Sequence, residues 1–467
     1  MRALARGLLS CKNNGLAMGR RMRFLGTFAA LSALPLAAAS AQVRSGVPVA
    51  PAPPVYIPPP AAATPPQPPV IVPQPPVVAP PPVVLPPPLW DPRDALALLA
   101  FIQQIGTEGL SPADYDPAGL ITALRSGNAM LLAHAATDRF NTLSSDLAFG
   151  HVRGDDRQDW HIPDPDLDPN RQALLLQVAL AQHRVPDALR GLLPSHPQYA
   201  ALRHALEITP VTETAKINRI RLNMDRWRWL PRDLGERYII VNVPAYTAAL
   251  VEDGVTTSRH HAVAGKISTP TPQLSATATG VILNPWWEVP KSIEGEVRGK
   301  AGYVPFKDPS GKILRWRQPP GPKNALGQLK FVMPNPKAIY LHDTNARSKF
   351  NSQVRAFSHG CIRTEHILAL ATRLLNEPNT DGVVTWTPDK IQAALDSQKT
   401  VQASFPKPLP VYIVYMSSAA LVDGKIVDYT DVYKRDGKVI AALLDQQPAA
   451  KPPVNGQPVP AKGVASK

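Results

Sequence analysis

The stretch Ala356-Phe357-Ser358-His359-Gly360-Cys361-Ile362-Arg363 decides how this 467-residue chain is interpreted. A second histidine, His342, lies upstream in Ile339-Tyr340-Leu341-His342-Asp343-Thr344. The chain has two cysteines, and Cys11 lies in a segment that we expect to be removed. A lone thiol in an exported protein has no disulfide partner and is open to oxidation. The pattern therefore indicates that Cys361 takes part in chemistry.

The N-terminus has the order of a secretory signal peptide, which predicts cleavage after residue 41. Residues 1–23 carry six basic side chains and no acidic one, and the apolar run 24–34 follows. Ala39-Ser40-Ala41 is a small-x-small cleavage site. The alternative is an uncleaved membrane anchor, although the apolar run is short for a span. We expect a periplasmic protein with no stable membrane span once the signal is removed.

Charge narrows the class of partner. The net charge of the whole chain is +14, and the six cations of the signal region account for much of it. The remainder is only mildly basic, which is compatible with an anionic polymer such as a cell wall. So mild a positive charge gives no case for nucleic-acid binding.

Composition divides the rest of the chain into segments. Residues 42–89 are rich in proline and predict a stiff polyproline II spacer, with a ligand for a proline-binding partner as the alternative. Apolar residues at helical spacing predict a helical domain over residues 90–215. Strand patterns predict a β-rich domain over 216–407, followed by a C-terminal strand extension over 408–445 and a disordered tail over 446–467.

The strand-rich region contains one long irregular segment. Residues 285–337 are rich in glycine, proline and lysine and contain Trp286, Trp287 and Trp316. Irregular segments of this length are usually functional. We interpret the segment as a capping insertion beside the site, rather than a disordered surface loop, because of its tryptophans.

Three features predict how Cys361 is activated. Gly360 allows a tight turn, and a helix is expected to begin just past the cysteine, where its N-terminal dipole favours an anion. His342 ends a strand and could take the thiol proton, forming an ion pair, with its other ring nitrogen held by a carbonyl such as that of Asp343. The backbone N–H groups of Gly360 and Cys361 are candidate oxyanion-hole donors, and Arg363 could bind a substrate carboxylate.

Each residue also has a simpler explanation. Cys361 could be a small core residue, and Arg363 could pair with Glu365. His359 lies two residues from the thiol and would tend to point elsewhere, so a structural role and a role in orientation or substrate binding stay open for it. No HExxH or CxxC pattern occurs, so neither a metal nor another cofactor is expected.

These residues resemble a known family. The segment Ser358–Arg363 with His342 upstream is similar to the signature of the L,D-transpeptidase (YkuD-type) catalytic domain. Asn223-Met224-Asp225-Arg226-Trp227-Arg228-Trp229, residues 284–290 and residues 410–415 resemble the large Gram-negative members with a helical scaffold domain. Such members usually carry a peptidoglycan-binding module before the Asn-Met-Asp-Arg-Trp stretch, and the space between Leu206 and Lys216 leaves no room for it.

The resemblance implies an α+β fold, with a helical scaffold domain and a β-sandwich or barrel-like catalytic domain that bears a capping insertion. It implies 3→3 cross-linking of peptidoglycan stem peptides through a Cys361 thioester, with release of terminal D-Ala and His342 as the base. It also implies acylation of Cys361 by carbapenems. We expect Ser358, Arg363, Tyr340 and Trp287 to contact the substrate, and Gly360, Asp343 and His359 to supply oxyanion donors or orientation.

Other functions fit the same constellation. Water could replace the amine acceptor, giving an L,D-carboxypeptidase. A protein acceptor would attach an envelope protein to peptidoglycan. A non-catalytic wall-binding scaffold is the alternative from a different class, and the intact cysteine and histidine argue against it.

Overall fold

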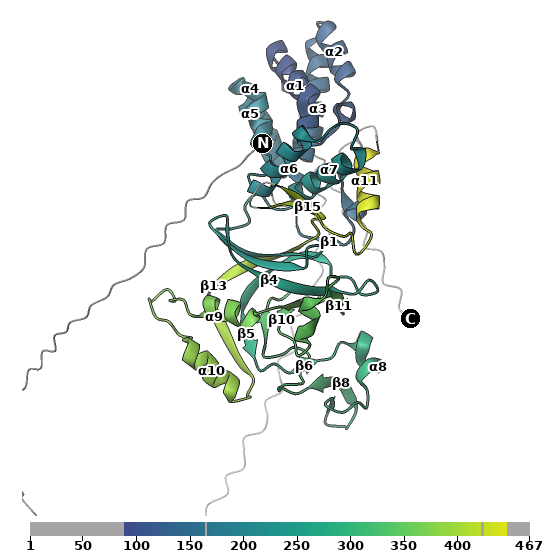
Figure 1. Cartoon of the computed structure of the whole chain (residues 1–467). Helices are drawn as coiled ribbons and strands as arrows, with labels where there is room; N and C mark the ends of the chain where they lie inside the picture. Colours follow the sequence, from purple (N-terminus) through teal and green to yellow (C-terminus); the bar gives the residue numbers. More distant parts are fainter. Residues whose placement is uncertain (1–87, 164–165, 422–424, 446–467) are drawn as a thin grey trace, which may run out of the picture. The chain divides into compact units, whose positions relative to one another are not determined.

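The computed structural model describes residues 88–163, 166–421 and 425–445 (Figure 1). The predicted signal peptide, nearly all of the proline-rich spacer and the C-terminal tail lie outside the described residues. Within the described ranges, none of the helices has both the length and the apolar character needed to cross a membrane.

The N-terminal part of the described chain is helical, as the apolar spacing predicted. Its helices are α1 (Pro92–Gln104), α2 (Pro117–Arg125), α3 (Ala129–Phe149), α4 (Pro169–Ala181), α5 (Val185–Arg190), α6 (Pro197–Ile208) and α7 (Thr214–Arg228). Short 3-10 turns η1 (Ile105–Glu108), η2 (Pro112–Tyr115) and η3 (Gly154–Arg157) connect them. One apolar core, built mainly from α1, α2, α3 and α5, holds the first five helices together.

Proline and a preceding capping residue fix where several helices begin. In α1, α2 and α4 an aspartate (Asp91, Asp116 or Asp168) stands just before the proline and accepts a hydrogen bond from a first-turn backbone N–H. Proline fits the first helical position because its missing N–H would have no partner there. The Asp-Pro pairs therefore mark these helix starts in the sequence itself.

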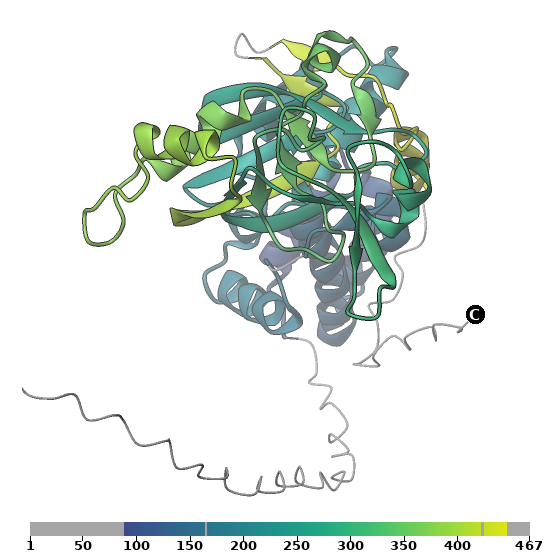
Figure 2. The ribbon, with the colours of Figure 1, turned by 90° about the horizontal axis from the view of Figure 1, so that it is seen from below.

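The second part is built on one large sheet that closes on itself. Its strands follow the order β1-β5-β13-β2-β3-β4-β12-β10-β9, and β9 also pairs with β5, which closes the sheet into a barrel-like ring (Figures 1 and 2). The α+β architecture predicted above is confirmed. The strands are β1 (Trp160–His161), β2 (Arg237–Asn242), β3 (Thr247–Glu252), β4 (Val255–Gly265), β5 (Gln273–Leu283), β9 (Leu329–Val332), β10 (Leu341–His342), β11 (Ala356–Ser358), β12 (Ile362–Thr364) and β13 (Val401–Val414).

The interior of the ring is apolar, and two helices cover one of its sides. Helices α9 (Ile367–Leu375) and α10 (Pro388–Asp396) insert apolar side chains into the same core as the strands. Both helices lie beside β13 in Figures 1 and 2. Strands β2, β3 and β4 form an antiparallel meander, and the chain turns between β3 and β4 at Asp253-Gly254.

The segment 408–445 is not the separate extension that the sequence predicted. Strand β13 runs without interruption across residue 408 and pairs with β5 on one side and β2 on the other. A break placed at 407 would cut a central strand, so residues 408–414 belong to the main sheet. The chain then forms β14 (Ser418–Ala420), β15 (Ile426–Asp428) and α11 (Asp436–Leu444), and α11 packs against α7.

The first part of the predicted insertion 285–337 forms a small folded unit, whereas β9 from the same segment belongs to the large sheet, so the predicted insertion extends too far. The small unit contains β6 (Trp287–Glu288), η4 (Lys291–Ile293), α8 (Glu294–Val297), β7 (Val304–Lys307) and β8 (Ile313–Gln318), and β6, β8 and β7 make a three-stranded sheet. Val289, Ile293 and Val297 form its core against Trp287, Tyr303 and Trp316. The tryptophans are therefore partly buried in a local core.

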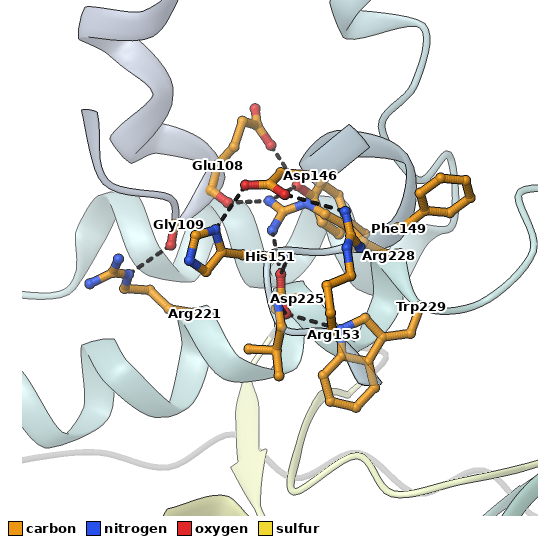
Figure 3. A network of polar contacts seen from close by, with 12 residues as sticks. Glu108, Gly109, Asp146, Phe149, His151, Arg153, Arg221, Asp225, Arg228 and Trp229 are labelled. Carbon is orange, nitrogen blue, oxygen red and sulfur yellow. Dashed lines mark hydrogen bonds and ion pairs between the residues drawn. The ribbon is translucent and has the colours of Figure 1, made fainter. Parts of the chain in front are cut away.

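Helix α7 joins the helical part to the rest of the chain through buried polar side chains (Figure 3). Asp225, fully buried, accepts hydrogen bonds from the backbone N–H groups of His151 at 2.6 Å and Val152 at 3.1 Å, and from the Trp229 indole at 3.0 Å. Arg228 donates to the Glu108 carbonyl and to the Tyr199 hydroxyl.

The opposite face of α7 contacts the C-terminal segment. Arg226 forms an ion pair with Asp436 of α11 at 2.8 Å, and both Asn223 and Arg226 donate to the Ser417 hydroxyl. The Asn-Met-Asp-Arg-Trp stretch is therefore a buried polar hub between three parts of the chain.

Candidate active site

The register of β10 and β12 places four of the predicted site residues on one face of the sheet. In the parallel pair β10–β12, His342 lies beside Arg363 and Leu341 beside Ile362. Leu341 and Ile362 are fully buried in the core. Since side chains alternate along a strand, His342 and Arg363 point to the other face, as do Tyr340 and Cys361 one step before the core pair. Cys361, which directly precedes β12, and His342 on β10 thus face the same side of the sheet, and no hydrogen bond among the described contacts joins their side chains.

The hydrogen bond of His342 fixes which of its nitrogens is the base. His342 is buried, and its Nδ1 lies 2.5 Å from the backbone carbonyl of Asp343. A carbonyl only accepts, so Nδ1 carries the proton. In the neutral imidazole Nε2 then has the free lone pair. The Asp343 carbonyl is the orienting group that the sequence suggested.

The Asp343 carboxylate has a structural role that differs from that of the Asp343 carbonyl. It accepts from the Gln328 backbone N–H at 2.9 Å and pairs with Arg347 at 3.0 Å. These bonds hold the loop after β10 in place, and the side chain is not a charged third member of a catalytic group.

Electrostatics favour a neutral resting pair instead of the expected ion pair. Burial, together with the positive charges of Arg363 and Lys330, lowers the pKa of His342 to about 3. Burial raises the pKa of the Cys361 thiol, although the backbone and side chain of Tyr340 and the Lys330 charge oppose that shift. With the pKa of His342 lowered and the pKa of Cys361 raised, the imidazole and the thiol are both neutral near pH 7.

Tyr340 contributes to the surroundings of the sulfur. Its phenol hydrogen bonds to Cys361, and burial raises the phenol pKa, so the hydroxyl stays a donor. The Trp287 side chain hydrogen bonds to Tyr340 from the capping insertion. The thiol itself is half-buried and lies 3.7 Å from the Ala338 carbonyl. Tyr340 thus lies next to the sulfur and Trp287 next to Tyr340, and contact of either with the substrate stays a prediction.

The expected helix dipole does not reach the thiol. Strand β12 follows Cys361 directly, and α9 begins only at Ile367. The apolar periodicity after Arg363 located the helix correctly but missed the short strand before it, because three residues are too few to show alternation. Stabilisation of the thiolate must therefore come from Tyr340 and nearby cations.

The turn before the cysteine is held by side-chain hydrogen bonds. The Ser358 hydroxyl donates to the Cys361 carbonyl at 2.6 Å and accepts from the Gly360 N–H at 3.1 Å. The Thr271 hydroxyl donates to the Gly360 carbonyl at 2.8 Å. Ser358 therefore holds the turn, and its contact with the substrate stays a prediction.

These bonds change the predicted oxyanion hole. The Gly360 N–H is already occupied by Ser358, so it is not a free donor. No hydrogen bond joins the Cys361 N–H to any other described residue, and Cys361 is therefore the remaining backbone candidate. The geometry supports one of the two predicted donors.

Two parts of the chain match models of known domain families. A model of the L,D-transpeptidase catalytic domain (YkuD) matches residues 236–403, and a scaffold-domain model matches residues 86–206. Residues 236–403 are therefore an L,D-transpeptidase (YkuD) catalytic domain, and residues 86–206 are a scaffold domain. A curated Haemophilus influenzae protein named "Putative L,D-transpeptidase" is 28% identical over 295 residues, which cover 57% of this chain and 58% of that protein. The chain therefore spans little more than half of this relative's length.

Solved structures give weaker matches. An L,D-transpeptidase from Mycobacterium smegmatis is 18% identical, covers 38% of this chain and 58% of its own, and has a TM-score of 0.20. L,D-transpeptidase 3 from Mycobacterium tuberculosis is 15% identical, covers 38% of this chain and 61% of its own, and has a TM-score of 0.21. The assignment of the two domains rests on the family models that match residues 236–403 and 86–206.

The capping insertion of the L,D-transpeptidase domain contacts the catalytic turn through His359. The His359 Nε2 lies 3.3 Å from Glu296 on α8 and 3.3 Å from Lys266 at the end of β4. A lone pair on Nε2 accepts from the ammonium, whereas a proton on Nε2 donates to the carboxylate. His359 therefore links the insertion to the turn. It makes no hydrogen bond to Cys361 among the described contacts.

Two residues of the site were not predicted from the sequence. Thr271 supports the turn from the loop before β5, and nothing local in the sequence marks it. Lys330 lies on β9 opposite His342. Its position between the buried Leu329 and Phe331 is the signal that could have identified it, because alternation places a residue so flanked on the face away from the core.

The chemistry open to this site is acyl transfer by a thiol. Among the described residues, no group of three or more histidine, cysteine, aspartate or glutamate side chains could hold a metal ion. What the site does provide is a thiol, a base with a fixed tautomer, a free backbone donor and two cations.

Substitution of Gly360 tests the geometry of the turn. Gly360 has φ +118°, and an added Cβ would lie 3.2 Å from the Ile339 Cδ1. We expect Gly360→Ala to cost about 1–3 kcal/mol of stability and to slow acylation of Cys361 about tenfold to hundredfold by displacing the sulfur. Urea unfolding and the rate of carbapenem adduct formation measure the two effects.

Gly254 provides the matched control. It also has a positive φ, +75°, but lies in the β3–β4 turn with no atom within 4 Å of an added Cβ. Gly254→Ala should lower stability and leave the acylation rate unchanged. Equal acylation rates for Gly360→Ala and the unsubstituted protein would contradict a positioning role for the turn.

Proposed function

We propose that this chain is a peptidoglycan L,D-transpeptidase that forms 3→3 cross-links between diaminopimelate residues. The observation that carries the proposal is the strand register, which sets Cys361 and His342 on one face, together with the Asp343 carbonyl that leaves the His342 Nε2 free. A thiol and a neutral imidazole base so arranged suit nucleophilic attack on an amide.

The reaction proceeds in two acyl transfers. In the first, the Cys361 sulfur attacks the carbonyl between diaminopimelate and terminal D-Ala, while His342 takes the thiol proton. His342 then gives that proton to the departing nitrogen, D-Ala leaves as a free amine, and a thioester remains. In the second, a side-chain amine of diaminopimelate on another stem attacks the thioester, and the thiol is restored.

The energy for the cross-link comes from the amide that is broken, so the overall exchange needs no other co-reactant. The developing negative charge on the carbonyl oxygen lies within reach of the Cys361 N–H, the candidate oxyanion donor. The capping insertion, which reaches the sulfur through Trp287 and Tyr340, would close over the bound stem and limit attack by water.

Export would place this activity in the periplasm. The support is the charge and apolar order of residues 1–41 in the sequence. The proline-rich spacer would then let the enzyme reach into the wall layer.

Carbapenem labelling tests the nucleophile. Incubating the purified protein with a carbapenem should add the mass of one inhibitor, and Cys361→Ala should show no adduct while keeping its circular dichroism spectrum. Only Cys11 and Cys361 carry thiols in the whole chain, so loss of the label assigns the site. Absence of an adduct on folded protein would overturn the proposal.

Analysis of muropeptides identifies the reaction itself. After incubation with sacculi rich in tetrapeptide stems, 3→3 linked dimers support transpeptidation. Tripeptide monomers alone would indicate an L,D-carboxypeptidase, and stems joined to a protein would indicate attachment of an envelope protein. The Cys361→Ala protein serves as the blank for each product.

A further inference from the structure

Lys330 occupies a position that the reaction as described above does not use. It is the Cα partner of His342 across the β9–β10 pair, just as Arg363 is the partner of His342 across β10–β12. Residues paired across strands point to the same face. Lys330, His342 and Arg363 therefore form a row over three adjacent strands, with the imidazole between two cations.

Neither cation has a contact ion pair. Neither Lys330 nor Arg363 makes a hydrogen bond or a contact ion pair with another residue of the described ranges; the Lys330 Nζ lies 5.0 Å from the centre of the Tyr340 ring, and the charges that attract it are first that of Cys361, when ionised, and then that of Glu288. Both side chains are half-buried, and burial lowers the pKa of each.

Other half-buried arginines of the domain are paired differently. Arg237, the first residue of β2 in the same sheet, makes ion pairs with Glu252 at 3.1 Å and with Glu377 at 2.5 Å. Half-buried cations without such partners are costly unless a ligand supplies the charge. Lys330 and Arg363 therefore point to an anion that binds between them during the reaction.

We propose that Lys330 and Arg363 together bind the free carboxylate of the residue that leaves, and so select stems that end at that residue. The inference rests on the proposed function. His342 must protonate the departing nitrogen, and in an amino acid the carboxylate is one carbon away from that nitrogen. The carboxylate must therefore lie close to the imidazole, within reach of the cations on either side of it.

Lys330 and Arg363 together explain how the enzyme would select stem peptides by their length. A stem with one more residue would present an amide in place of the carboxylate, leaving two half-buried cations without a counter-charge. Discrimination based on unpaired charges of this kind is stronger than discrimination by shape. The pair also affects the base, because a bound carboxylate cancels the charges that hold His342 neutral and lets it accept the thiol proton more readily.

A charged alkylating agent tests the anion site without any peptidoglycan substrate. The rate of Cys361 labelling by iodoacetate is divided by the rate for neutral iodoacetamide, and the ratio is normalised to that of free N-acetylcysteine. We expect the protein to favour iodoacetate, and Lys330→Met or Arg363→Met each to reduce the ratio about tenfold, the usual size of a charge-assisted contact. Lys438→Met, on exposed α11, removes the same charge and should leave the ratio unchanged.

A second experiment measures the preference for a donor peptide with a free terminal carboxylate. A tetrapeptide donor with a free terminal carboxylate is compared with the same peptide ending in a carboxamide. The unsubstituted protein should favour the acid, and both substitutions should shrink that preference mainly through KM. Arg363→Lys should restore part of it, since it keeps the charge.

The outcomes separate this inference from the proposed function. If neither donor reacts but the alkylation ratio responds to Lys330→Met, the anion site stands and the proposed reaction fails. If donors react with equal efficiency as acid and amide, and the alkylation ratio is the same in all variants, the carboxylate pair is overturned while the transpeptidase proposal survives.

Discussion

His342→Gln should slow acylation of Cys361 by about 10²–10⁴-fold, the usual contribution of a positioned general base. Glutamine keeps a donor for the Asp343 carbonyl and similar bulk, so the strand should be preserved while the proton acceptor is lost. The rate constant for carbapenem adduct formation, followed by mass spectrometry, measures the effect. His366→Asn is the matched control, because His366 is exposed and has φ +51°, a conformation that asparagine tolerates.

The pH profile distinguishes a neutral resting pair from an ion pair. The lowered pKa of His342, about 3, means that the imidazole is protonated only in strong acid. The raised pKa of the Cys361 thiol means that the thiolate forms only at alkaline pH. The acylation rate should therefore stay level between about pH 5 and 8, with no step near the ordinary histidine pKa of about 6.5. A step there that disappears in His342→Gln would contradict the neutral pair.

The same shift has a consequence for stability. A histidine whose folded pKa lies below its unfolded value contributes stability that is complete above the unfolded pKa and is lost as the pH falls toward the folded value. His342 should therefore make the folded domain weaker in acid.

The groups that we propose to react could be predicted from the sequence more directly than their surroundings. Cys361, His342 and the Asp343 carbonyl follow from residue type, from the isolation of the thiol and from a histidine that ends a strand. The Asp-Pro pairs likewise mark helix starts, because capping and the fixed φ of proline are local effects.

What the sequence could not show depends on contacts between distant segments. The use of the Gly360 N–H by Ser358, the support from Thr271 and the place of Lys330 beside His342 all require knowledge of strand register. The continuity of β13 across residue 408 was missed for the same reason, since Pro406, Lys407 and Pro408 look like a linker until both neighbouring strands are known. Register is a property of the whole sheet and not of any segment.

Asp225→Ala should be the most destabilising single substitution that leaves the reactive groups untouched, with a loss of about 3–5 kcal/mol of unfolding free energy. The carboxylate is fully buried and accepts hydrogen bonds from His151, Val152 and Trp229. Its removal leaves these donors without partners, and the buried Arg228, 3.4 Å away, loses its nearest negative charge.

Urea unfolding followed by tryptophan fluorescence measures the loss, and comparison with two further variants assigns it. Asp225→Asn keeps one acceptor and the shape of the side chain, so it should fall between Asp225→Ala and the unsubstituted protein. Asp138→Ala, at an exposed position on α3, should change stability by less than about 0.5 kcal/mol. Below the unfolding transition, all three variants should be acylated at the same rate, because the hub positions the helical part and α11 and not Cys361. An Asp225→Ala protein as stable as Asp138→Ala would show that the buried hub does not hold these segments together.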